Sequence, residues 1–202
     1  TVEGVEWESW DKAPAILGKH REEVEDSLSK ALSLHNPDLY TMLRYHLGLG
    51  DEHGNPTLSN QGKGLRSSLC MFACEAVGGV SEQALAAAVA IDLIHNFSLI
   101  HDDIQDGDME RRHRPTLWAI WGTPRALQAG NVMRTLADLG IQQLPRYKVA
   151  PEIVAMCSKL LTDAFKMIAY RAESQLARWV APLFKRHEDE ARKFLRSVFR
   201  AI

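Results

Sequence analysis

The sequence predicts an all-α fold, in which one helix follows another around a single core. Apolar residues recur at helical spacing along most of the chain, whereas the apolar–polar alternation that predicts strands is nearly absent. Hydrophobic residues make up 46% of the 202 residues, which is enough to bury a substantial core. We therefore expect residues 1–202 to form one domain.

The expected helices have recognisable start and stop signals. A polar loop over residues 48–62 separates two of them, and Gly78-Gly79 ends the helix that follows this loop. Ser81, a favoured N-cap residue, begins the longest helix, which reaches Asp106. A second loop covers residues 107–115. The sequence predicts helices at 15–34, 38–46, 63–77, 81–106, 117–121, 124–139 and 152–168, and an amphipathic ending at 169–202.

Three carboxylates stand together at the end of the longest predicted helix. Asp102 and Asp106 are four residues apart and therefore share one helix face. Hard cations such as Mg²⁺ bind carboxylate oxygens and share them with substrate phosphates. A merely solvated acidic end is the weaker interpretation, because acidic residues oppose the dipole at a helix C-terminus. We predict a Mg²⁺-dependent diphosphate site, with Asp103 in a supporting role about 100° around the helix.

One stripe of this helix continues back from the carboxylates toward apolar residues. It runs through Ile91, His95, Ser98, Asp102 and Asp106. An isolated histidine is more often a hydrogen-bonded core residue, but the alignment of His95 with Asp102 favours a functional role. The stripe predicts one wall of a deep pocket that has an apolar floor and a metal-binding mouth.

Basic residues flank this helix on both sides in the sequence. Lys63 and Arg66 stand at the predicted start of the preceding helix, where positive charge is unfavourable unless an anion is bound. Arg111 and Arg112 follow the carboxylates, and the planar guanidinium fork suits phosphate oxygens. The alternatives are a solvated helix start for the first pair and a solvated basic loop for the second.

Composition argues against several other functions. The net charge of −2 provides no overall basic field, so we expect no nucleic-acid partner. Asp92, His95 and Asn96 interrupt the longest apolar stretch, so we expect no transmembrane segment. Three cysteines in no disulfide pattern, and an acidic N-terminus without a signal-peptide pattern, favour a cytoplasmic location.

The segment Leu93–Gly122 (LIHNFSLIHDDIQDGDMERRHRPTLWAIWG) resembles the trans-isoprenyl diphosphate synthases, or polyprenyl synthetases, and the resemblance covers about Leu43–Ile168. The segment Gly62–Leu69 (GKGLRSSL) resembles the upstream Gly-Lys-x-x-Arg motif of that family. The resemblance implies an isoprenoid synthase-type helical bundle around a central cavity, usually a homodimer. It also implies a Mg²⁺-dependent prenyltransferase that condenses an allylic prenyl diphosphate with isopentenyl diphosphate, head to tail.

The resemblance implies a role for each matched residue. Asp102 and Asp106, supported by Asp103, would bind the Mg²⁺ that bridges to the allylic diphosphate. Arg111 would contact the same diphosphate while charge builds on it. The isopentenyl diphosphate site would comprise Lys63, Arg66, His95 and Arg112.

Two further positions bear on product length. Phe97 and Ser98 stand fifth and fourth before Asp102, where side-chain bulk limits cavity depth in this family. The bulk of Phe97 predicts a short product of fifteen or twenty carbons, whereas Ser98 permits a somewhat longer one.

The chain departs from the family pattern in its C-terminal part. Asp102-Asp103 is the only Asp-Asp pair in the sequence, so the second aspartate-rich motif of the family is missing. Residues 169–173 look like the C-terminal helix of the family, and we therefore predict that several late helices are missing near 168/169. A chain that truly lacks them should be inactive. Gly64 and Ser67 replace the arginine and proline that are common in the family.

Other functions fit part of this pattern. A class I terpene synthase, or cyclase, would use the same carboxylates but has no second diphosphate to hold, so the basic set argues against it. A non-catalytic partner subunit of a prenyl synthase often loses its aspartates, whereas this chain keeps the first set. A metal phosphohydrolase built on His101-Asp102 would lack its other dispersed ligands.

Overall fold

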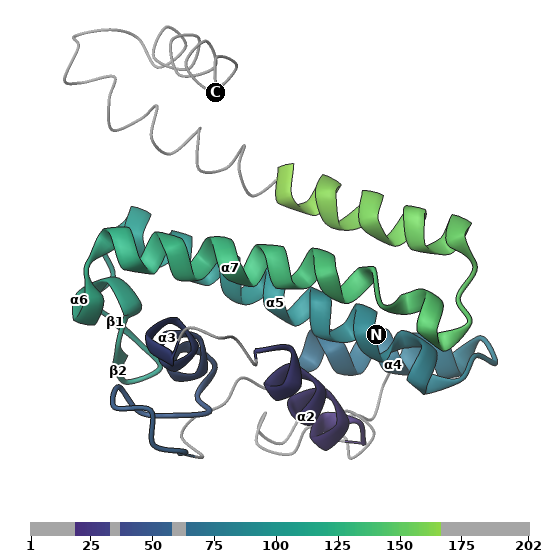
Figure 1. Cartoon of the computed structure of the whole chain (residues 1–202), viewed down its shortest axis with the longest axis horizontal. Helices are drawn as coiled ribbons and strands as arrows, with labels where there is room; N and C mark the ends of the chain where they lie inside the picture. The colour runs from purple at the N-terminus through teal and green to yellow at the C-terminus, as the bar shows by residue number, and fades with distance from the viewer. Residues whose placement is uncertain (1–18, 33–36, 58–63, 167–202) are drawn as a thin grey trace, which may run out of the picture.

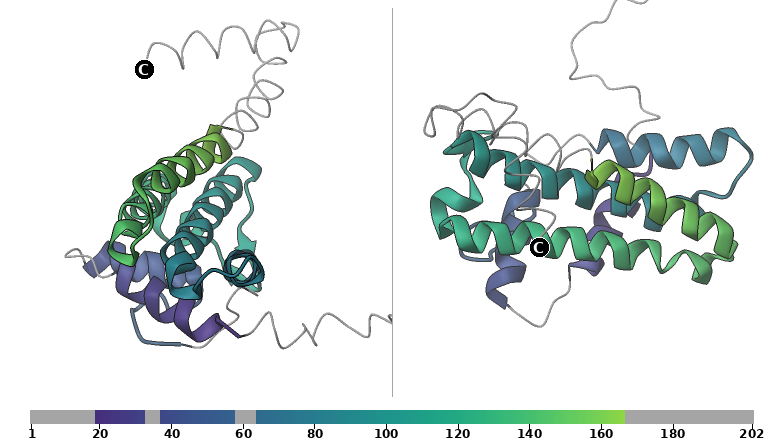
Figure 2. Two further views of the ribbon diagram at one scale, coloured as in Figure 1. Left: turned by 90° about the vertical axis from the view of Figure 1, so that its right-hand side faces the viewer. Right: turned by 90° about the horizontal axis from the view of Figure 1, so that it is seen from above.

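The computed structural model describes residues 19–32, 37–57 and 64–166, and the predicted all-α fold is confirmed for them. Two long helices, α5 (Ser81–Asp106) and α7 (Thr123–Ile141), lie side by side at the centre of the fold (Figure 1). A further helix, residues 151–166, runs along one side of this pair. On the opposite side lie α2 (Arg21–Ala31) and α3 (Pro37–Leu47) (Figure 2).

Shorter elements complete the arrangement. The helix α4 (Leu65–Ala76) packs along the first half of α5. The chain leaves α5 through a small hairpin and reaches α7 by way of a short helix. In order, these remaining elements are β1 (Glu110–Arg111), β2 (Arg114–Pro115), α6 (Leu117–Trp121) and, after α7, the 3₁₀ turn η1 (Leu144–Tyr147).

The helix α5 is the core of the described fold. It contacts α2, α4 and α7, which bury apolar residues on most of its circumference. It is also long and apolar enough to cross a membrane, but half of its most apolar stretch is buried, as in the core helix of a globular protein. Small residues let α7 approach closely, since a Cβ on Gly130 would come within 2.7 Å of the His101 ring.

The hairpin is the main correction to the expected local structure. A loop was predicted for residues 107–115, but Glu110–Arg111 pairs antiparallel with Arg114–Pro115. The turn places Arg112 and His113 at φ values of 53° and 62°, a left-handed conformation that arginine and histidine rarely adopt. The sequence therefore carries no usual signal for this turn.

Contacts with α3 hold the hairpin in place. The Arg114 guanidinium lies 3.9 Å from the centre of the Tyr45 ring and donates to the Gly50 carbonyl at 2.9 Å. The Tyr45 hydroxyl donates in turn to the Pro115 carbonyl at 2.9 Å. Partners distant in the sequence thus fix the turn and, with it, the position of Arg112.

The starts of two helices differ slightly from the predicted ones, and some predictions concern residues that the structure does not describe. Val80, not Ser81, is the N-cap of α5, and Ser81 is the first helical residue. The predicted helix at 63–77 is α4, which begins two residues later. Lys63, the predicted break near 168/169 and the segment 169–202 lie outside the described residues.

Candidate functional site

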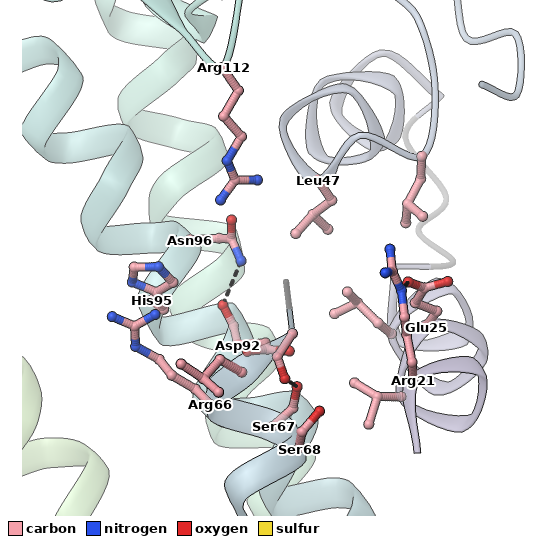
Figure 3. A pocket seen from close by; sticks show the side chains of 15 residues that line it. Arg21, Glu25, Leu47, Arg66, Ser67, Ser68, Asp92, His95, Asn96 and Arg112 are labelled. Carbon is pink, nitrogen blue, oxygen red and sulfur yellow. Dashed lines mark hydrogen bonds and ion pairs between the residues drawn. The ribbon is translucent and has the colours of Figure 1, made fainter. Parts of the chain in front are cut away.

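A cavity of about 260 Å³ lies between α2, the start of α4, α5 and the hairpin (Figure 3). The α2 wall combines apolar side chains with a surface ion pair, in which Arg21 Nε donates to Glu25 Oε1 at 2.7 Å. The α5 wall presents Asp92, His95 and Asn96. The cavity therefore has a mixed apolar and charged wall on α2 and a polar wall on α5.

Three basic residues from separate elements meet at this cavity. Arg66 extends from α4 so that its guanidinium lies beside the His95 ring, and Arg112 reaches from the hairpin toward Asn96 (Figure 3). Burial, together with the charges of Arg66 and Arg112, lowers the pKa of His95 to about 4. His95 is thus neutral at physiological pH, and the two guanidinium groups supply the positive charge.

The two departures from the family motif, Gly64 and Ser67, lie together at the start of α4. Gly64 is the N-cap of α4 at φ 56°, a left-handed conformation that glycine adopts without strain. The buried Ser67 hydroxyl donates to the Gly64 carbonyl at 2.9 Å. Burial raises the pKa of Asp92 on α5, although Ser67 and the charge of Arg66 oppose this shift.

Asp103 and Arg111 form a buried ion pair beside the cavity. Asp103 is 2% exposed, and its Oδ1 lies 2.7 Å from Arg111 Nε and 2.6 Å from Nη2. Burial raises the pKa of this carboxyl, and the arginine only partly offsets the shift. Asp103, which the sequence predicted as a supporting metal residue, is therefore placed as the partner that orients Arg111.

Asp102 and Asp106 lie further along α5, outside this cavity. Asp102 is partly buried and Asp106 is exposed, one helical turn beyond it. Within the described ranges, no three His, Cys, Asp or Glu side chains converge as a metal site. Two carboxylates at this spacing nevertheless fit Mg²⁺, which commonly takes one or two protein carboxylates and completes its shell with water and phosphate. The single pocket expected for His95 and both aspartates is not formed by the described residues alone.

The two residues assigned to product length also lie outside the cavity. Phe97 is 4% exposed, and its ring centre is 4.5 Å from that of His101 and 5.6 Å from that of Phe165. Ser98 is partly buried, and its hydroxyl donates to the His95 carbonyl at 2.7 Å. Phe97 therefore packs between α5 and the 151–166 helix, and the effect of both residues on product length stays a prediction.

One residue near the site was not predicted from the sequence. His46 of α3 lies in a second, smaller hollow with Arg111 and Arg112. Its ring is hydrogen-bonded to the Asn96 side chain. The sequence gives only a weak indication that His46 has a role. His46 follows the buried Met42 by one helical turn, so a polar residue stands on the apolar face of α3.

A helical bundle whose central helix carries the aspartates, with basic residues gathered at a cavity beside it, is the fold of the isoprenoid synthases. The family model described as Polyprenyl synthetase matches residues 51–172, and the chain belongs to this family. A polyprenyl synthetase from Streptomyces coelicolor A3(2) has a similar structure, with a TM-score of 0.71 and 32% identity, over 83% of this chain and 47% of that one.

Two curated relatives from Mycobacterium tuberculosis (strain ATCC 25618 / H37Rv) are similar in sequence. The chain is 43% identical over 122 residues to its (2E,6E)-farnesyl diphosphate synthase, covering 60% of this chain and 34% of the relative. It is 35% identical over 127 residues to its geranylgeranyl diphosphate synthase, covering 63% of this chain and 36% of the relative. The chain thus spans about a third of the length of these curated relatives.

Proposed function

We propose that this protein is a trans-prenyltransferase that condenses an allylic prenyl diphosphate with isopentenyl diphosphate, head to tail, to a product of fifteen or twenty carbons. The observation that carries the proposal is the meeting of Arg66, His95 and Arg112 at one cavity. This cavity lies beside α5, the helix that also bears Asp102 and Asp106. A cyclase needs no second diphosphate site, so this basic cavity favours the synthase over a class I terpene synthase.

The family resemblance suggests a role for each basic residue, and the meeting of Arg66, His95 and Arg112 at one cavity supports these roles. Arg66 and Arg112 would bind the diphosphate of isopentenyl diphosphate through charge-assisted hydrogen bonds, and neutral His95 would add a further one. Lys63, which lies outside the described residues, is expected to join them. Held in this way, the double bond of isopentenyl diphosphate is positioned to attack the allylic carbon. No side-chain nucleophile is required.

The allylic diphosphate would lie at the carboxylate end of α5. Arg111, oriented by Asp103, would stabilise the negative charge that builds on the departing diphosphate. Mg²⁺ held by Asp102 and Asp106 would neutralise further charge on the same group. A proton is then lost from the condensed product, and the released diphosphate is the base that we propose. We further propose a cytoplasmic homodimer.

A product assay separates the synthase from a cyclase and from a non-catalytic partner subunit. The protein is incubated with Mg²⁺, geranyl diphosphate and isotopically labelled isopentenyl diphosphate, and the dephosphorylated products are resolved by chromatography. Labelled alcohols of fifteen or twenty carbons support the synthase. Cyclic hydrocarbons formed without isopentenyl diphosphate would identify a cyclase instead. Absence of product, despite measurable binding of isopentenyl diphosphate, would favour the partner subunit.

A further inference from the structure

His46 carries a polar atom that the proposed chemistry leaves unexplained. Its Nε2 atom is buried and has no hydrogen-bond partner among the described residues. Because a buried polar atom without a partner is costly, native structures retain few, and each calls for an explanation. A hydrogen bond with the Asn96 side chain raises the pKa of His46 against the effect of burial, and because Nε2 has no partner in the described ranges we assign this contact to Nδ1.

The surroundings of this nitrogen are positively charged. His46 shares the smaller hollow with Arg111 and Arg112 of the hairpin. Arg111 is paired with Asp103, which lines the same hollow. Burial and the nearby arginines lower the pKa of His46 to about 3, so its ring is neutral at physiological pH. A neutral nitrogen beside two guanidinium groups is suited to share a hydrogen bond with an anion.

The hollow beside His46 connects this nitrogen with the proposed diphosphate site. It has a volume of about 30 Å³, enough for one oxygen-sized group. Arg112 lines both this hollow and the larger cavity that contains Arg66 and His95. An oxygen of a diphosphate bound by Arg112 could therefore enter the hollow and meet His46.

We propose that His46 is a further diphosphate-binding residue, whose Nε2 forms a hydrogen bond with the diphosphate held by Arg112. This inference rests on the proposed function of the cavity. In the tautomer whose Nδ1–H donates to Asn96, Nε2 accepts from a phosphate hydroxyl; in the other tautomer Nδ1 accepts from the Asn96 amide and Nε2–H donates to an ionised phosphate oxygen. Nδ1 remains on Asn96 and fixes the ring plane.

Two substitutions separate this role from a structural one. In His46→Gln the amide group stands near the position of Nε2, whereas in His46→Asn it stands near that of Nδ1. Titration calorimetry with isopentenyl diphosphate, and with inorganic pyrophosphate, should show His46→Gln binding within about threefold of the wild type. His46→Asn should bind about tenfold more weakly, the effect of one hydrogen bond. The exposed His53 provides the matched control, and His53→Asn should leave binding unchanged.

The opposite pattern, in which the Asn variant binds normally and the Gln variant does not, would show that His46 acts only through Asn96. Equal binding by both variants and the wild type, or equal loss in both, would also overturn the proposal. A second measurement does not depend on any variant folding. In protein with ¹⁵N-labelled histidine, pyrophosphate should shift the Nε2 resonance of His46 and not that of His53, and an unshifted His46 resonance would refute the contact.

Arg112→Gln separates failure of this proposal from failure of the proposed function. If the wild type binds neither isopentenyl diphosphate nor pyrophosphate, the assignment of the cavity is wrong and the role of His46 is rejected with it. If the wild type binds and Arg112→Gln weakens binding, while His46 is insensitive in both experiments, only the role of His46 is rejected.

Discussion

Mild acid should destabilise this protein through two partly buried histidines. His46 and His95 have pKa values lowered to about 3 and about 4, from an unfolded-state value near 6.5. As pH falls below about 6.5, the unfolded chain takes up protons at both histidines that the folded protein does not bind, and His101, whose pKa burial also lowers, adds to the effect. The stabilisation is therefore complete above that pH and is lost progressively as pH falls toward the folded pKa values.

The size of the effect follows from the number of protons. Each histidine lowers the free energy of unfolding by about 1.4 kcal/mol per pH unit in this window. Because His95 is only partly buried, solvent screening reduces its share. We expect the two histidines together to remove about 2 kcal/mol between pH 6 and pH 5. The free energy of unfolding is measured by urea denaturation at pH 7, 6 and 5.

Variants identify the groups responsible. His46→Gln and His95→Gln should each make the dependence on pH less steep, whereas His53→Gln, at an exposed site, should not. Measurements stay at or above pH 5, because burial raises the pKa of Asp92 and Asp103 and their protonation favours the folded state in acid. A wild-type protein whose stability is unchanged between pH 6 and pH 5 would refute this reasoning.

Three further substitutions test individual contacts. Asp103→Ala should cost about 2–4 kcal/mol of stability in urea denaturation, since it leaves Arg111 without its buried partner, and a cost below about 0.5 kcal/mol would contradict the ion pair. Phe97→Ala should lengthen the product in the elongation assay and destabilise the fold by about 3–5 kcal/mol, and unchanged product length on chromatography would reject Phe97 as the limit. Gly130→Ala should lower the melting temperature, because its Cβ would come within 2.7 Å of the His101 ring, and an unchanged value would show that the ring can shift.

The sequence predicts most of the described helices because their signals are local. Apolar periodicity runs unbroken from the start of α5 to Asp106, and the helix extends over those residues. The family resemblance also predicted that Arg66 and His95 would meet at one site, whereas the sequence pattern alone did not. Their separation of 29 residues provides no spacing argument, and the packing of α4 on α5 brings them together.

The features that were missed depend on contacts between distant residues. Arg112 and His113 adopt left-handed conformations because Arg114 is anchored on Tyr45, far away in the sequence, and not because of their own preferences. His46 faces Arg112 because α3 packs beside the hairpin. Neither arrangement leaves a periodic pattern or a short motif.

The most direct test of the central claim is the dissociation constant of isopentenyl diphosphate, measured without Mg²⁺, for the wild type and two variants. Arg66→Gln and Arg112→Gln each remove charge-assisted hydrogen bonds, and each should weaken binding by about 10- to 100-fold. Arg125→Gln, an exposed arginine on α7, is the control and should bind like the wild type. Equal affinities for all four proteins, or no saturable binding by the wild type, would contradict the assignment of this cavity.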